Sequence, residues 1–263
     1  MPPALIFPGH LPCPFTLLRG KISPMKMPLK LVKLCAAALT LAGAAAAFAS
    51  PAHELTSQEK AAGWKLLFDG QTTHGWHTFK TQAFPSHGWE VADGWLHCLG
   101  NGGGDVISDA EFNDFELEWD WKQAQAGNSG LKYFVLETRK EPLGHEYQMI
   151  DDEREPDATR ADGKRVTASF YDVFKPSKTP LKPAGEINHS RILVQGNHVE
   201  HWLNGVKVLE YECGSEATKA AVADSKFKNV AGFGNKVRGH LLLQDHHSQV
   251  WFQNIKIREL PAR

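Results

Sequence analysis

Residues 144–152, GHEYQMIDD, bring acid, imidazole and amide side chains together in one short run. Side chains alternate along a β-strand, so a strand here places Glu146 and Gln148 on one face and Tyr147 and Met149 on the other. A carboxylate can take up a proton, and an amide can orient hydroxyl groups. One face of this strand therefore carries chemistry suited to a polar substrate.

A second polar pattern occurs in residues 115–122, FELEWDWK, where three acids alternate with apolar residues. Carboxylates about 5–5.5 Å apart are what a retaining glycosidase uses, and Glu116, Glu118 and Asp120 share one face of the expected strand. The spacing and order differ from the acid pattern of sandwich-fold glucanases. We therefore favour the simpler interpretation, in which the apolar residues face the core and the acids face water.

Histidines are frequent but form no metal-binding motif. No pair has the HExxH spacing of a zinc protease. A site built from His145, His201 or His246 with Glu146 or Asp151 could assemble in space, and the sequence does not decide this. The serine-nucleophile and phosphate-loop motifs are also absent, because GNGGGD at 100–105 lacks the flanking strand and helix.

The first 49 residues have the pattern of a leader that ends in a secretory signal peptide. Three lysines precede the alanine-rich run LCAAALTLAGAAAAFA, and the run ends in the small-x-small sequence Ala47-Phe48-Ala49. The apolar run is too short and too rich in alanine for a membrane span. We expect a periplasmic or secreted protein without a membrane span.

Charge and cysteine content narrow the classes of partner and site. Five of the 29 basic residues and none of the 30 acidic residues lie in positions 1–49, so the remainder carries a net charge of −6. This balance argues against nucleic-acid binding. Cys98 and Cys213 are the two cysteines of residues 50–263, and either one disulfide or two buried thiols would fit.

The rest of the chain divides into short segments of period two, separated by glycine, asparagine and aspartate. The clearest signal is HVEHWL-NG-VKVLEY, since Asn204-Gly205 is typical of the type I′ turn of a β-hairpin. Residues 221–227 suggest a short helix or turn. After a polar lead at 50–61, we expect a single all-β domain over residues 62–260.

The ordered segments together resemble a known family. GWKLLFDGQTTHGW, GWEVADGWL, FELEWDWK, NSGLKYFV, GHEYQMIDD, GEINHSRILVQGNHVEHWLNGVKVLEYE and GHLLLQDHHSQVWFQNIKI are similar, in order and spacing, to the 3-keto-disaccharide hydrolase domain family. That family is also described as 3-keto-glucoside 1,2-lyase and 3-keto-2-hydroxy-glucal hydratase. The resemblance implies a concanavalin-like jelly-roll sandwich of two antiparallel sheets, with a small sugar bound on the concave face.

The resemblance also implies a reaction. The ketone at C3 of a 3-keto glycoside acidifies the proton on C2, so a base can remove it, the group at C1 leaves by β-elimination, and water adds to the enone. Glu146 or His201 could be the base, and Lys132 or a bound divalent metal could stabilise the enolate. Hydroxyl groups of the substrate would be oriented by the remaining candidates, Gln148, Asp151, Asn128, His246 and His145.

The sequence departs from the family pattern at two positions, and two other functions are compatible with the same fold. Ile187 stands where a tryptophan is usual, and His247 stands where a glycine is usual, which could alter a turn beside the site. A jelly roll also serves non-catalytic carbohydrate-binding modules and endo-glucanases. The sequence leaves open the metal requirement, the preferred anomer and aglycone, and the oligomeric state.

Overall fold

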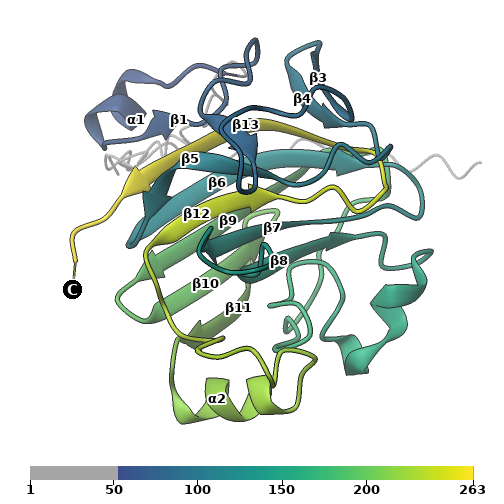
Figure 1. Cartoon of the computed structure of the whole chain (residues 1–263), viewed down its shortest axis with the longest axis vertical. Helices are drawn as coiled ribbons and strands as arrows, with labels where there is room; N and C mark the ends of the chain where they lie inside the picture. Colours follow the sequence, from purple (N-terminus) through teal and green to yellow (C-terminus); the bar gives the residue numbers. More distant parts are fainter. Residues whose placement is uncertain (1–52, 263) are drawn as a thin grey trace, which may run out of the picture. The chain divides into compact units, whose positions relative to one another are not determined.

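The computed structural model describes residues 53–262, which form two stacked antiparallel sheets (Figure 1). The eight-stranded sheet contains, in spatial order, β11 (Val206–Glu212), β10 (His198–Leu203), β9 (Asn188–Gln195), β6 (Phe115–Gln123), β13 (Val250–Glu259), β4 (Trp95–Cys98) and β3 (Trp89–Ala92), with β1 (Lys65–Leu66) paired to β13. The five-stranded sheet contains β2 (Trp76–Thr78), β5 (Val106–Phe112), β12 (Gly239–Leu243), β7 (Asn128–Val135) and β8 (His145–Ile150). The predicted all-β sandwich of two antiparallel sheets is confirmed.

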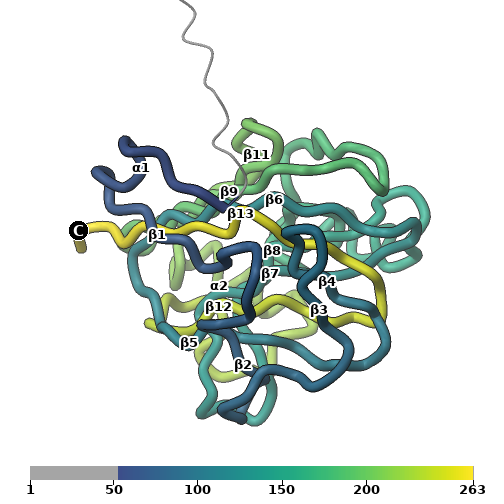
Figure 2. Tube along the Cα trace, turned by 90° about the horizontal axis from the view of Figure 1, so that it is seen from above, coloured from purple at the N-terminus to yellow at the C-terminus, as the bar shows by residue number. Residues whose placement is uncertain are grey.

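Short helices lie outside the sheets. They are α1 (Ser57–Ala61), α2 (Glu216–Ala223) and the 3₁₀ turns η1 (Pro156–Thr159) and η2 (Ala161–Gly163). The predicted short helix near residue 221 corresponds to the end of α2, which follows β11 at one end of the sandwich (Figure 1). Figure 2 shows the last strand, β13, running through the middle of its sheet, where it pairs with β6 and β4.

The predicted hairpin is present as β10 and β11. Its two turn residues, Asn204 and Gly205, have φ angles of 48° and 79°. A type I′ turn needs positive φ at both positions, and these two residue types tolerate that conformation. The hairpin forms one edge of the eight-stranded sheet, with β10 paired to β9 on its inner side.

Strand β6 shows how alternation divides the two faces of a sheet. Phe115, Leu117, Trp119 and Trp121 are fully buried between the sheets, as predicted. The expectation that all three acids face water is wrong for Glu116, which is 4 % exposed. Its carboxylate accepts hydrogen bonds from two guanidinium groups, those of Arg191 and Arg258, because β9 and β13 flank β6 and bring them to the same face.

Strand β8 forms the edge of its sheet, yet its whole length is buried. The segment 166–174 runs along this edge, so that the amide of Ala168 donates to the carbonyl of Gln148 (2.8 Å) and the amide of Tyr171 to that of Glu146 (3.1 Å). Such a cover satisfies an edge that would otherwise be open to pairing. It also raises a wall of loop residues beside the strand.

Three other expectations have different outcomes. Cys98 and Cys213 are both free and buried, so the disulfide alternative is wrong. No helix within residues 53–262 has the length and apolar character needed to cross a membrane. The predicted leader and signal peptide lie outside the described residues.

Candidate active site

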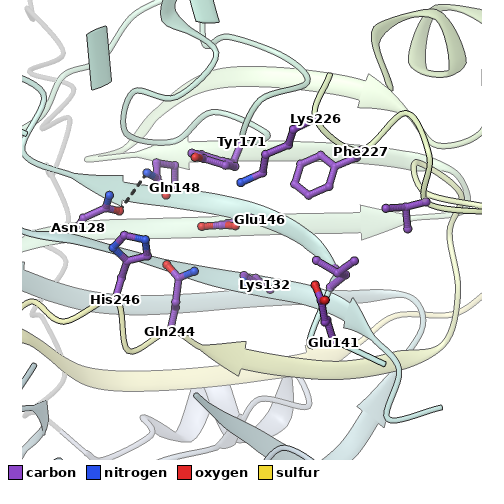
Figure 3. A pocket seen from close by; sticks show the side chains of 13 residues that line it. Asn128, Lys132, Glu141, Glu146, Gln148, Tyr171, Lys226, Phe227, Gln244 and His246 are labelled. Carbon is purple, nitrogen blue, oxygen red and sulfur yellow. Dashed lines mark hydrogen bonds between the residues drawn. The ribbon is translucent and has the colours of Figure 1, made fainter. Parts of the chain in front are cut away.

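A pocket of about 330 Å³ lies on the face of the five-stranded sheet that is turned away from the other sheet (Figure 3). Strands β7 and β8 form its floor, and loops form its walls. It is lined by Asn128, Lys132, Glu141, Leu143, Gly144, Glu146, Gln148, Tyr171, Lys226, Phe227, Val230, Gln244 and His246. The volume is at the small end of the range for small-molecule sites, roughly 300–1,000 Å³.

The pairing of β7 and β8 sets the floor. Lys132 lies directly opposite Glu146, and Gly130 lies opposite Gln148. Residues two apart share a face, so all four positions are on the outer side, while Tyr147 and Leu131 enter the core. A side chain at Gly130 would not fit this arrangement, because its Cβ would lie 2.5 Å from Glu146 Oε1. The glycine therefore provides the space for the carboxylate.

Glu146 is the carboxylate at the centre of the pocket (Figure 3). Its side chain is 6 % exposed, and burial raises its pKa, against the opposing effect of the positive charges of Lys132 and Lys226. The ammonium of Lys132 lies 4.0 Å from Asp105 Oδ2, a carboxyl group whose pKa is also raised by burial. A carboxylate with a raised pKa, flanked by two ammonium groups, is suited to taking up and releasing a proton.

Amide groups occupy the side of the pocket beside Glu146. The two orientations of the Gln148 amide place its nitrogen either 3.2 Å from Asn128 Oδ1 or 3.1 Å from Glu146 Oε1. In the second orientation the same nitrogen also lies 3.0 Å from the carbonyl of Ser129. The Gln148 amide can therefore hydrogen-bond either the Glu146 carboxylate or the Asn128 side chain. Asn128 adds a second amide to this end of the pocket.

The loop after β12 supplies the opposite polar wall. The backbone amide of Gln244 donates to the backbone carbonyl of Gly130 (3.0 Å), and the hydroxyl of Ser129 donates to the backbone carbonyl of Gln244 (2.8 Å). These bonds fix the loop against β7 and place Gln244 and His246 in the pocket. The next residue, His247, has a φ of 59°, in the left-handed region that favours glycine, so the expected change beside the site falls on a turn.

Two predicted site residues, His145 and His201, lie in the core and do not line the pocket. His201 Nδ1 is 2.9 Å from the carbonyl of Ala168, which only accepts, so Nδ1 carries the proton. Nε2 then accepts from the hydroxyl of Tyr133 (2.8 Å), which accepts in turn from that of Tyr211 (2.7 Å).

The last link of this buried chain is His145. Its Nδ1 donates to the hydroxyl of Tyr211 (2.8 Å), and its Nε2 has no hydrogen-bond partner among the described residues. Both imidazoles are neutral, and burial lowers the pKa of His145 to about 3 and that of His201 to about 4. The assignment of His201 as a base and of His145 as a substrate ligand is therefore corrected.

Asp151 is also outside this pocket. It caps a turn, since its carboxylate accepts from the backbone amides of Ala126 (2.9 Å), Glu153 and Arg154 (both 3.2 Å). Although burial opposes the shift, these hydrogen bonds lower its pKa. His145 lies on the face of β8 opposite to Glu146, because side chains alternate along a strand. Asp151 follows the end of β8 at Ile150, and its carboxylate is taken up by the turn that it caps.

The loop residues of the pocket carry no sequence signal that would have revealed them. Tyr171 comes from the segment that covers β8, and its hydroxyl donates to Asp157 Oδ2 (2.7 Å). Lys226 and Phe227 come from the turn after α2, and Glu141 from the loop before β8. These residues lie far from Glu146 along the chain or outside its strand, and they come close to it because of how the loops fold over the sheet.

The sequence left open a metal site built from His145, His201 or His246 with Glu146 or Asp151, and within residues 53–262 no three of these side chains lie close enough together to hold a metal ion. Among the described residues, one group of three possible ligands lies close together, His198, Glu200 and Glu210 on the outer face of β10 and β11. The ammonium of Lys207 already bridges the two carboxylates, at 3.1 Å and 2.5 Å. This group is remote from the pocket in the fold.

Known proteins resemble this chain in sequence and structure. The sequence model of one protein family, described as the 3-keto-alpha-glucoside-1,2-lyase-like domain, matches residues 63–258. A 3-keto-disaccharide hydrolase from Bacteroides thetaiotaomicron is 34 % identical over 230 residues, covering 75 % of this chain and 79 % of that protein.

Two solved structures of proteins assigned as glycosyl hydrolases, both from Parabacteroides distasonis, share the fold. One is 35 % identical, with a TM-score of 0.74, and covers 80 % of this chain and 100 % of that chain. The other is 26 % identical, with a TM-score of 0.61, and covers 75 % and 99 %. From the match over most of its length, the chain belongs to the 3-keto-alpha-glucoside-1,2-lyase-like domain family.

Proposed function

We propose that the protein cleaves 3-keto glycosides by removing the proton on C2, eliminating the group at C1 and hydrating the resulting enone, which amounts to hydrolysis. The observation that carries this proposal is the buried Glu146 carboxylate between Lys132 and Lys226. Elimination next to a ketone needs a base and a positive group for the enolate oxygen. Both are present on the floor of one pocket.

The roles follow from the positions of the side chains. Glu146 takes the proton from C2, because burial raises its pKa toward the working range of a general base. Lys132, directly across from it on β7, stabilises the negative charge on the C3 oxygen. Gln148, Asn128 and His246 face the same cavity and orient the hydroxyl groups of the sugar.

The comparisons support a carbohydrate-active enzyme of the hydrolase class, and the named relative supports the keto-sugar substrate. The acids of β6 do not serve an endo-glucanase mechanism at this pocket, because they lie on the outer face of the other sheet. A non-catalytic binding module would have little use for a buried carboxylate with a raised pKa. We further propose a periplasmic or secreted location, on the basis of the leader pattern.

The test compares a 3-keto glucoside with its unoxidised parent in deuterated buffer. We expect release of the aglycone from the keto sugar alone, with deuterium incorporated at C2 of the product. A parallel reaction with a chelator reports any metal requirement. Saturable sugar binding without turnover of either compound would instead support the binding-module function, and cleavage of the parent alone would support a glucanase.

A further inference from the structure

Lys226 approaches the centre of the pocket from the wall opposite to the sheet. Its ammonium lies 4.1 Å from the centroid of the Tyr171 ring, and Figure 3 shows it pointing toward Glu146. Lys132, in contrast, comes from the floor, where Asp105 lies 4.0 Å from its ammonium. The two lysines thus reach Glu146 from different directions and from different elements.

The turn that carries Lys226 is held in place by several contacts. The backbone amide of Lys226 donates to Asp172 Oδ2 at 2.6 Å. The amide of Phe227 donates to the hydroxyl of Ser225 at 3.0 Å, and its ring stacks on Phe233 with centroids 4.1 Å apart and planes 18° apart. The ammonium is therefore presented by an anchored wall of the pocket.

The position of the Lys226 ammonium in the pocket favours the loss of its proton during a reaction. Burial lowers its pKa, and the neighbouring charges of Arg165 and Lys132 act in the same direction, while Glu146 and Asp172 oppose it. A lysine with a lowered pKa is a stronger acid than a free lysine. When Glu146 is protonated by substrate, the main opposing charge disappears.

We propose that Lys226 is the acid that protonates the leaving group. This inference rests on the proposed function. Glu146 takes the C2 proton, and the C2–H electron pair forms an enolate. The enolate then forms the C1–C2 double bond while the C1–O bond breaks with its electron pair going to the glycosidic oxygen, which receives a proton from the ammonium of Lys226.

Lys226 and Glu146 also serve the hydration step, in which each exchanges its proton in the direction opposite to that of the elimination. Water adds through its oxygen to C1 of the enone and passes a proton to the neutral amine of Lys226, while the protonated Glu146 returns a proton to C2. Both residues end in their starting protonation states, so no other reactant than water is consumed. One pocket can therefore carry out elimination and hydration.

The test is the dependence of the rate on the leaving group, in the purified protein and its Lys226→Met variant. The substrates are a 3-keto methyl glucoside, whose alkoxide leaves poorly, and a 3-keto 4-nitrophenyl glucoside, whose phenolate leaves without assistance. General acid catalysis contributes typically 10²–10⁴-fold. We expect the variant to lose at least about 100-fold in kcat/KM on the methyl glucoside and less than about threefold on the nitrophenyl glucoside.

Lys228→Met is the matched control, since Lys228 belongs to the same turn but does not line the pocket, and it should behave as the wild type on both substrates. An equal loss of Lys226→Met on both substrates would show a structural or binding role and overturn the proposal, as would no loss on either. If the wild type turned over neither keto glucoside, the proposed function itself would fail, and the role of Lys226 with it. If the wild type turns over both substrates and the variant loses activity equally on both, the acid role of Lys226 is refuted and the proposed function stands.

Discussion

The buried chain that joins His145, Tyr211, Tyr133 and His201 predicts a loss of stability in mild acid. Both imidazoles are buried and neutral, and their pKa values in the folded protein are lowered to about 3 for His145 and about 4 for His201 by burial. The unfolded chain exposes them, with pKa values near 6.5. Between pH 6.5 and pH 4 the unfolded state therefore binds more protons, so the folded state loses stability as the pH falls.

The size of this loss follows from the two pKa values. On going from pH 7 to pH 5, each histidine lowers the free energy of unfolding by about 2 kcal/mol, and the pair by about 4 kcal/mol. That is a large part of the 5–15 kcal/mol typical of a folded domain. His198 has the opposite sign, because its hydrogen bonds to Glu212 and Glu200 outweigh burial and raise its pKa.

Urea unfolding at intervals between pH 7 and pH 5 measures this dependence, because most carboxyl groups of the unfolded chain titrate below that range. His201→Gln lowers the stability at all pH values, since it disturbs the hydrogen bonds to Tyr133 and Ala168. The informative quantity is the average slope between pH 7 and pH 5, which should decrease by about two thirds of a proton, or about 1 kcal/mol per pH unit. A variant with the wild-type slope would refute the assignment of His201 as a neutral core residue.

The remaining predictions concern the pocket and β6. Glu146→Gln should reduce turnover of a 3-keto glucoside at least about tenfold, roughly 1.4 kcal/mol in barrier, and wild-type turnover would remove it as the base. Gly130→Ala should fold normally but displace the Glu146 carboxylate, so steady-state assays should show a loss of kcat with an unchanged urea midpoint. Glu116→Ala leaves Arg191 and Arg258 without their shared partner and should cost about 2 kcal/mol in urea unfolding, whereas catalysis should not change.

Local patterns in the sequence determined the fold class and several of its parts. Alternation assigned the core-facing residues of β6 and separated the two faces of β8, and Asn204-Gly205 determined a turn that needs positive φ at both residues. These signals are local, because strand periodicity and turn conformation depend on neighbouring residues. The same alternation placed Glu146 and Gln148 on one face, and it would have excluded His145 had it been applied to every position of the strand.

Tertiary structure decided which side chains share the pocket and which are structural. Tyr171 and Lys226 reach Glu146 from loops whose positions depend on contacts distant in sequence, such as the bond from Lys226 to Asp172. The sequence allows His201 to act as a base, yet its side chain faces the other sheet, and both of its ring nitrogens are hydrogen-bonded in the core. Residue type sets what a group can do, but only long-range packing sets what it can reach, because the loops over a sheet are placed by the whole fold.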